Sequence, residues 1–305
     1  MENKIIVQSF SPELFVHWIE YVDATPKTIE TYTKSIRRFA RYVKENGITQ
    51  PTRADIIAYR EELKATLKPA TVKAYIVAVR LFFQWTHQEG LYPNIAEHIK
   101  GVKIDIQHKK DYLTSNQVKK LLSSVDRSTE KGKRDYAILV LMLTSGLRTI
   151  EVARANIEDM RALGDFTVLY IQGKGHNEKN EYVKIAEPVE DAIREYLTER
   201  KISDTASPLF ASESNRNNWG RMTTRSISRI VKNALVNVGF NSDRLTAHSL
   251  RHTTATLNLL NGGTIEETRQ LLRHTNINTT LIYSHALSRA ENNSEERVAK
   301  AIFND

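Results

Sequence analysis

Apolar residues recur at intervals of three and four through residues 1–100, and this period restricts that part of the chain to helices. The segment Pro26–Glu45 carries one apolar stripe, formed by Ile29, Tyr32, Ile36, Phe39 and Val43. A second predicted helix, Pro69–Gln88, carries another stripe, formed by Val72, Ile76, Val79 and Phe83. Shorter helical patterns cover residues 11–22 and 53–67. Four helices in this length predict a compact helical bundle.

The rest of the chain is also mostly helical, with one clear β signal. Short segments at Phe166–Ile171 and Glu181–Ile185 flank a Gly-Lys-Gly-His-Asn turn, which predicts a β-hairpin. Thr114 and Gln117 have the spacing of a capping box at the start of a helix. Further helices are predicted over residues 135–143, 188–200, 224–238, 248–260 and 264–273. The predicted fold class is therefore mainly α with a small antiparallel sheet.

A linker separates the two parts. Pro93, Gly101 and the polar basic run at 107–110 interrupt the helical patterns, as is typical of a connection between domains. We expect a helical domain over 1–100, a linker over 101–112, a second domain over 113–283 and a C-terminal segment over 284–305.

Composition narrows the class of protein. The 305 residues include 44 lysines and arginines against 36 acidic residues, and the net charge of +8 favours some attraction for a polyanion. The absence of cysteine excludes a disulfide scaffold, cysteine-ligated zinc and thiolate catalysis. The longest apolar run, Ala137–Leu143, is too short to span a bilayer, and residues 1–9 lack the apolar core of a signal peptide. We expect a soluble, cytoplasmic protein, although an ordinary basic enzyme would have the same composition.

Several polar residues have spacings that suit chemistry at a phosphate. Arg148 and Glu151 follow the apolar helix, where a surface ion pair is the simpler interpretation. Lys174 lies in the Gly-Lys-Gly turn, where it either reaches a phosphate or stays solvated. His248 and Arg251 share a helical face and together offer an imidazole and a bidentate guanidinium to one phosphate.

A metal site is the weaker interpretation of the histidines. His248 and His252 are four residues apart, as in zinc-binding helices. The glutamate of the zinc-protease pattern is missing, however, and Arg251 would place a cation beside the metal. We therefore expect no metal. His274 and Tyr283 complete the set, and for Tyr283 the alternative is a buried aromatic anchor.

The combination and its order resemble the tyrosine recombinase family, also called the phage integrases, including the Xer-like enzymes. The matching segments are Thr-Ser-Gly-Leu-Arg148-x-x-Glu151, Gly-Lys174-Gly, Ala-His248-x-Leu-Arg251-His252-Thr, and Leu-x-His274 followed by Thr279, Thr280 and Tyr283. The resemblance covers essentially the whole chain. It implies a helical, SAM-like core-binding domain followed by the tyrosine recombinase catalytic domain.

The resemblance also implies a mechanism. Tyr283 would attack a DNA phosphate and form a 3′-phosphotyrosyl bond, which a 5′-hydroxyl then attacks to rejoin strands without ATP, metal or other cofactor. The implied catalytic residues are Arg148, Lys174, His248, Arg251, His274 and Tyr283, with Glu151 and His252 in support. The sequence departs from the family pattern at Arg273, where glycine is common, and in a longer turn that leaves Lys179 as an alternative general acid to Lys174.

The implied partners are a double-stranded DNA recombination site, three further copies of the chain in a tetramer, and an accessory directionality factor. The segment 284–305 would dock on a neighbouring subunit. Residues expected to contact DNA are Lys34, Arg37, Arg38, Arg41, Lys44, Lys73 and Arg80. Integration or excision of a mobile element and resolution of DNA dimers both fit the sequence. The competing classes are a DNA-binding module without chemistry, a type IB topoisomerase and a metal hydrolase.

Overall fold

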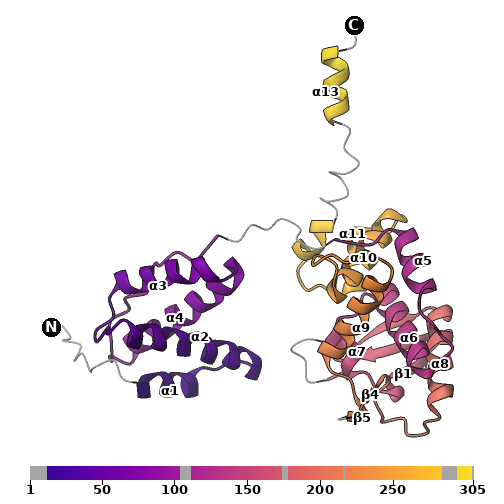
Figure 1. Ribbon diagram of the computed structural model, residues 1–305, viewed down its shortest axis with the longest axis horizontal. Coiled ribbons are helices and arrows are strands. Elements are labelled where there is room, and N and C mark those ends of the chain that lie inside the picture. Colours follow the sequence, from indigo (N-terminus) through magenta and orange to yellow (C-terminus); the bar gives the residue numbers. More distant parts are fainter. Residues whose placement is uncertain (1–11, 104–110, 174–177, 216, 284–293, 304–305) are drawn as a thin grey trace. The chain divides into compact units, whose positions relative to one another are not determined.

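The computed structural model describes residues 12–103, 111–173, 178–215, 217–283 and 294–303. The chain divides into two compact units, residues 1–106 and 107–305, and each is considered by itself (Figure 1). The expected fold class, mainly α with a small antiparallel sheet, is confirmed. In the part of the chain that the structure describes, no helix is both long and apolar enough to cross a membrane.

The N-terminal unit is a bundle of helices whose core is rich in aromatic rings. Its helices are α1 (Pro12–Tyr21), α2 (Pro26–Glu45), α3 (Arg53–Thr66) and α4 (Pro69–Gln88). Phe39 of α2 lies edge-on to Phe83 of α4, with 5.9 Å between ring centroids, and Trp18 of α1 lies edge-on to Phe82 at 5.7 Å. All four rings are almost fully buried. The predicted stripes face this core, except that Ile29 at the start of α2 is only half-buried.

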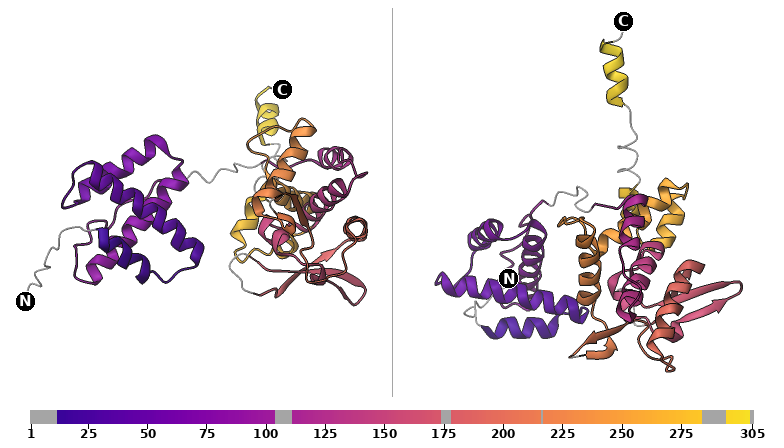
Figure 2. Two further views of the ribbon diagram at one scale, coloured as in Figure 1. Left: turned by 60° about the horizontal axis from the view of Figure 1, so that its bottom comes forward. Right: turned by 45° about the vertical axis from the view of Figure 1, so that its right-hand side comes forward.

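A three-stranded antiparallel sheet lies in the C-terminal unit (Figure 2). Its strands are β1 (Met160–Leu163), β2 (Phe166–Ile171) and β3 (Glu181–Ile185), with β2 in the middle. Leu169 pairs with Met160 on one side and with Val183 on the other. A separate hairpin joins β4 (Ala211–Ser214) to β5 (Asn217–Arg221).

Helix α6 is the centre of the C-terminal unit. The helices are α5 (Ser115–Ser123), α6 (Glu130–Ser145), α7 (Thr149–Arg154), α8 (Glu187–Arg200), α9 (Thr224–Asn237), α10 (Ala247–Leu260), α11 (Ile265–Leu272) and α13 (Ser294–Phe303). A 3-10 turn covers Ile157–Asp159 and a further helical segment covers residues 278–283. Helix α6 is buried almost all round because α8 and α10 pack against it.

Local signals predicted some bounds to the residue and missed others. The bounds of α2, α4, β2 and β3 agree with the periodic patterns, and the capping box of Thr114 and Gln117 is present at α5. Helix α6 begins at Glu130 rather than near Asp135, because its first turn is charged and carries no apolar period. The strands β1, β4 and β5 were not predicted, since they are short and mostly exposed.

One glycine joins three helices beside the site described below. Gly146 ends α6 with a φ of 58°, and its carbonyl oxygen accepts a hydrogen bond from Nη1 of Arg251 on α10 at 2.5 Å. A Cβ here would lie 2.6 Å from Cδ2 of Leu272 at the end of α11. Glycine suits both the left-handed backbone and the close approach.

Candidate active site

A fully buried carboxylate fixes the first of the predicted residues. Arg148 precedes α7, and its backbone N–H donates to Oε2 of Glu151 at 2.8 Å. Its Nη1 atom donates to Oε1 of the same carboxylate at 2.7 Å. Glu151 has no exposed surface, whereas the Arg148 side chain is 31% exposed. The pair is therefore not the surface ion pair of the simpler interpretation.

Arg273 brings a second cation to the same carboxylate, a contact that sequence reasoning missed. Its Nη2 atom donates to Oε2 of Glu151 at 2.9 Å, and its side chain is only 7% exposed. Burial raises the pKa of Glu151, but the charge of Arg273 and the hydrogen bonds from Arg148 outweigh burial and lower it overall. Glu151 is thus a carboxylate at neutral pH.

Arg251 is locked in place from within α10. It is 2% exposed, and its two terminal nitrogens donate to the carbonyl oxygens of Gly146 and Leu272. Burial and the charge of Arg148 lower the pKa of Arg251 to about 9, which still leaves the guanidinium charged at neutral pH. The structure therefore keeps two arginines, from the start of α7 and from α10, in one site.

The predicted histidines and tyrosine gather around these arginines. The rings of His248 and His252 are 4.6 Å apart between centroids, and the rings of His252 and Tyr283 are 5.2 Å apart. Nδ1 of His274 is 2.9 Å from Oγ1 of Thr280, a fully buried threonine that sequence reasoning did not single out as a contact. Burial and the charge of Arg251 lower the pKa of His274 to about 4, so the imidazole is neutral at neutral pH.

Tyr283 is a buried side chain next to cations. It lies in the helical segment 278–283, is 3% exposed, and packs with Ala255 and Leu272. Burial raises its pKa to about 12, while the charges of Arg251 and Arg148 act in the opposite direction. Tyr283 is thus a buried phenol that is neutral at neutral pH, and the two arginine charges offset part of the effect of burial on its pKa.

The site opens into a pocket of about 670 Å³. Arg148, His248 and Arg251 line it, together with Lys232 of α9 and Asp243. Lys232 donates to the carbonyl oxygen of Ser242 at 2.8 Å. The sequence around Lys232 predicts only an ordinary polar position on a helix. Its role in the pocket depends on the tertiary fold, which brings this side of α9 to the pocket.

One of the two candidate general acids is paired with a buried carboxylate. Lys174 lies outside the described residues. Lys179 is described, and its Nζ atom is 2.5 Å from Oδ2 of Asp159, a carboxylate whose side chain is 3% exposed. Lys179 is thus held in an ion pair with a buried partner.

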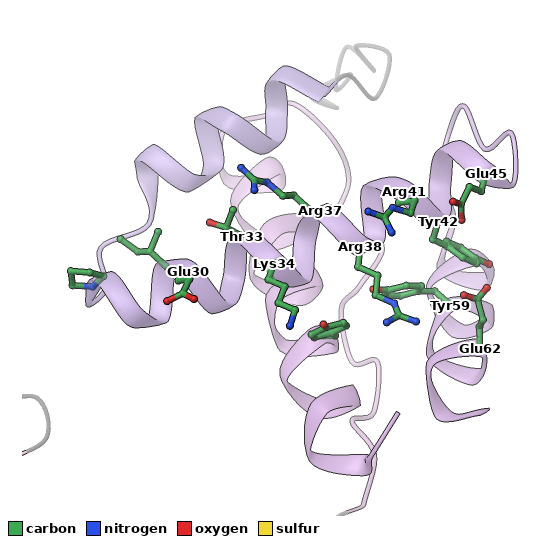
Figure 3. A pocket seen from close by; sticks show the side chains of 13 residues that line it. Glu30, Thr33, Lys34, Arg37, Arg38, Arg41, Tyr42, Glu45, Tyr59 and Glu62 are labelled. Atoms are coloured by element: carbon green, nitrogen blue, oxygen red, sulfur yellow. The ribbon is translucent and has the colours of Figure 1, made fainter. Parts of the chain in front are cut away.

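Four of the seven predicted DNA contacts line one groove in the N-terminal unit (Figure 3). The groove measures about 860 Å³, and its basic residues all come from α2: Lys34, Arg37, Arg38 and Arg41. Lys44 on α2 and Lys73 and Arg80 on α4 are exposed but lie outside its lining.

The groove also contains groups that the charge pattern did not reveal. Tyr42, Tyr59 and Tyr75 line it, and the Arg38 guanidinium lies 5.9 Å from the centroid of the Tyr75 ring. The Tyr59 hydroxyl is buried and has no hydrogen-bond partner among the described residues. Three glutamates also line the groove, namely Glu30, Glu45 and Glu62 (Figure 3).

Within the described ranges, no cluster of three or more histidine, aspartate or glutamate side chains has the geometry to hold a metal ion. The pair of His248 and His252 is flanked by Arg251, and their rings meet edge to face. The chemistry that the described site offers is anion binding by fixed cations beside a phenol.

Known protein families match both parts of the chain. Residues 111–289 match the phage integrase family, and residues 13–124 match the N-terminal SAM-like domain of phage integrases. Tyrosine recombinase XerA of Pyrococcus horikoshii is 31% identical over 284 residues, covering 93% of this chain and 91% of that protein.

Solved structures share the fold. The XerH site-specific recombinase, in a post-cleavage complex with a palindromic difH substrate, superposes with a TM-score of 0.72 at 21% identity, covering 88% of this chain and 80% of that one. A lambda integrase tetramer bound to a Holliday junction gives 0.70 at 15% identity, covering 91% and 78%. With both family matches and a relative of this similarity along nearly its whole length, the chain belongs to the phage integrase family of site-specific tyrosine recombinases.

Proposed function

We propose that Tyr283 is the nucleophile with which this recombinase cleaves and rejoins DNA. Its Oη atom attacks a backbone phosphorus, the bond from phosphorus to the 5′-oxygen breaks, and a 3′-phosphotyrosyl bond holds the strand. A 5′-hydroxyl from the partner duplex reverses the step and joins the new strand. The observation that carries this proposal is the placement of Arg148 and Arg251 around a buried tyrosine.

Arginines that are already held in place would stabilise the transition state. Arg251 is held by two carbonyl oxygens and Arg148 by Glu151, so neither has to reorganise when negative charge develops on the phosphate oxygens. His274, oriented by Thr280, adds a further hydrogen bond. Three such donors at one phosphate supply the charge stabilisation that a metal provides in other enzymes.

Two protons have to move. Tyr283 must lose one, and the cations around it oppose the effect of burial on its pKa. We assign that transfer to His248, which is exposed at the start of α10 and lines the pocket. The ring of His252 lies between the rings of His248 and Tyr283. Lys174 is the proposed acid for the departing 5′-oxygen, since the alternative, Lys179, is bound to Asp159.

The proposed substrate is double-stranded DNA gripped by both units. XerH was solved with its difH substrate and lambda integrase as a tetramer on a Holliday junction, which supports a tetrameric DNA complex here. The proposal includes an accessory factor that sets the direction of recombination. It also includes a cytoplasmic location, where DNA is accessible. Integration or excision of a mobile element and resolution of DNA dimers are both compatible with it.

Helix α13 is the proposed contact between subunits. Its apolar residues are strongly exposed: Val298 is 57% exposed, Ile302 66% and Phe303 80%. A neighbouring copy that covers this stripe would remove apolar surface from water.

The groove in the N-terminal unit is the proposed DNA contact of that unit. Lys34, Arg37 and Arg41 are exposed cations spaced along α2, as contact with successive phosphates requires. The three glutamates in the lining limit where a phosphate backbone can pass.

Tyr283→Phe is expected to abolish the covalent complex, because it removes the nucleophilic oxygen and little else. The substrate is a duplex selected from a random-sequence pool by binding to the purified chain, with nicks that trap the cleaved state. Denaturing gels show the adduct. Tyr21→Phe, at an exposed tyrosine of α1, is the control and should form as much adduct as the wild type. A chain that binds the duplex and yields no wild-type adduct is not acting as proposed.

Lys174→Ala is expected to slow cleavage about 100-fold or more, while Lys179→Ala leaves the rate of the folded enzyme unchanged. Replacing the bridging 5′-oxygen with sulfur gives a leaving group that needs no proton, because a thiol is far more acidic than an alcohol. That substrate should restore cleavage by Lys174→Ala. Rescue of Lys179→Ala instead would assign the acid to Lys179.

The double substitution Arg37→Gln and Arg41→Gln is expected to reduce the slope of log binding constant against log salt by about one for each lost phosphate contact. Lys131→Gln with Lys201→Gln, at exposed positions of the C-terminal unit, is the charge-matched control. Equal slopes for both double variants would show that the groove does not contact DNA phosphates.

Replacing Val298, Ile302 and Phe303 with aspartate is expected to prevent tetramer formation on DNA while a single chain still binds its half-site. Mass photometry of the complexes measures this directly. Lys300→Gln on the same helix is the control. Wild-type tetramers from the triple variant would show that α13 is not the contact.

A further inference from the structure

Arg273 occupies a backbone conformation that glycine would adopt more easily. It follows α11 with a φ of 54°, in the left-handed region. For a residue with a Cβ this conformation is strained relative to the right-handed one. Its side chain is nonetheless buried, at 7% exposed, and does not line the pocket. Strain of this kind persists where surrounding contacts fix the residue.

Those contacts lead to Glu151. Nη2 of Arg273 shares the Oε2 atom of Glu151 with the backbone N–H of Arg148, at 2.9 Å and 2.8 Å. Nη1 donates to the carbonyl oxygen of Leu271 at 2.8 Å, which fixes the guanidinium plane. Oε1 is left to the Arg148 side chain. One buried carboxylate therefore serves two arginines, and the three groups together carry a net positive charge.

We propose that Arg273 is a positioning residue, which holds Glu151 so that Arg148 meets the scissile phosphate in a fixed geometry with its charge uncancelled. A carboxylate paired with Arg148 alone would neutralise that arginine. With Arg273 present, the carboxylate is shared, and the arginine that lines the pocket remains an effective cation. This inference rests on the proposed function, since it concerns the same reaction.

The proposal predicts a change in pH dependence. Glu151 faces Arg148 at the start of α7, Arg251 of α10 and Arg273 after α11. Glu181 of β3 is a second acidic group whose charge acts on Arg273. Glu151 has to be ionised to hold Arg148, and Arg273 keeps its pKa low. Without Arg273, the effect of burial is opposed by Arg148 alone, so the pKa of Glu151 rises and cleavage should fall at a higher pH as the solution is acidified.

His274 titrates with the opposite sign. The charge of Arg273 helps to lower the pKa of His274, so removing Arg273 makes protonation of that imidazole easier. A protonated His274 is a stronger donor to phosphate and would assist cleavage at low pH. A shift of the acid limb of the pH–rate profile to higher pH therefore reports protonation of Glu151 and not of His274.

The experiment measures the single-turnover rate of adduct formation on the selected nicked duplex, at saturating DNA and across pH. Arg273→Ala is expected to lower the rate about 10-fold, the worth of one charge-assisted hydrogen bond, with unchanged DNA affinity. Arg273→Gly should be equally slow although it relieves the backbone, and Arg273→Lys should recover part of the rate. Arg194→Ala, at an exposed arginine of α8, is the control.

A double-mutant cycle separates this role from general stability. In a Glu151→Gln background, Arg273→Ala should add little further loss. If Arg273→Ala does not fold, Arg273→Lys and Arg273→Gln carry the comparison, and lysine should be the faster. A wild-type rate and an unmoved acid limb in the folded variants would overturn the inference. Failure of the wild type itself to form adduct would instead contradict the proposed function.

Discussion

The site depends on one buried carboxylate. Glu151 is fully buried, and burial alone would favour its neutral form. It stays ionised because a backbone N–H and two guanidinium groups point their donors at its two oxygens. These donors come from the start of α7 and the end of α11, so the carboxylate joins two segments far apart in sequence. Arg251 adds the third segment through the carbonyl oxygens of Gly146 and Leu272.

These contacts rely on backbone groups at helix ends. The carbonyl oxygens at the ends of α6 and α11 have no partner within their own helices, and Arg251 of α10 satisfies both. Gly146 permits this because it has no Cβ to contact Leu272. The arginine that we assign to the phosphate therefore also holds the helices together, which joins the stability of the fold to the geometry of the site.

Local sequence patterns predicted the parts of the fold that depend on local physics. The stripes of α2 and α4 and the alternation of β2 and β3 gave bounds that the structure reproduces. The charged first turn of α6 and the polar hairpin of β4 and β5 carry no such period, so they were missed or misplaced.

The sequence predicts which residues form the candidate site, but not which of them contact one another. The order of Arg148, His248, Arg251, His274 and Tyr283 carried the family resemblance, and the structure places these residues together. That Arg273 turns inward to Glu151, and that Thr280 orients His274, depends on how α11 and the segment 278–283 pack. A one-dimensional pattern shows Arg273 only as a departure from glycine.

The depressed pKa values of Arg251 and His274 have a thermodynamic meaning beyond catalysis. Each reflects burial first and then repulsion from the neighbouring arginines, and this repulsion is present in the protein without DNA. An anion bound between these groups would relieve it, and because the unfolded chain offers no such cluster, the binding energy would add to the stability of the fold. Under the proposed function, the catalytic domain would therefore be more stable with a phosphodiester bound than without one, because binding and folding are linked equilibria.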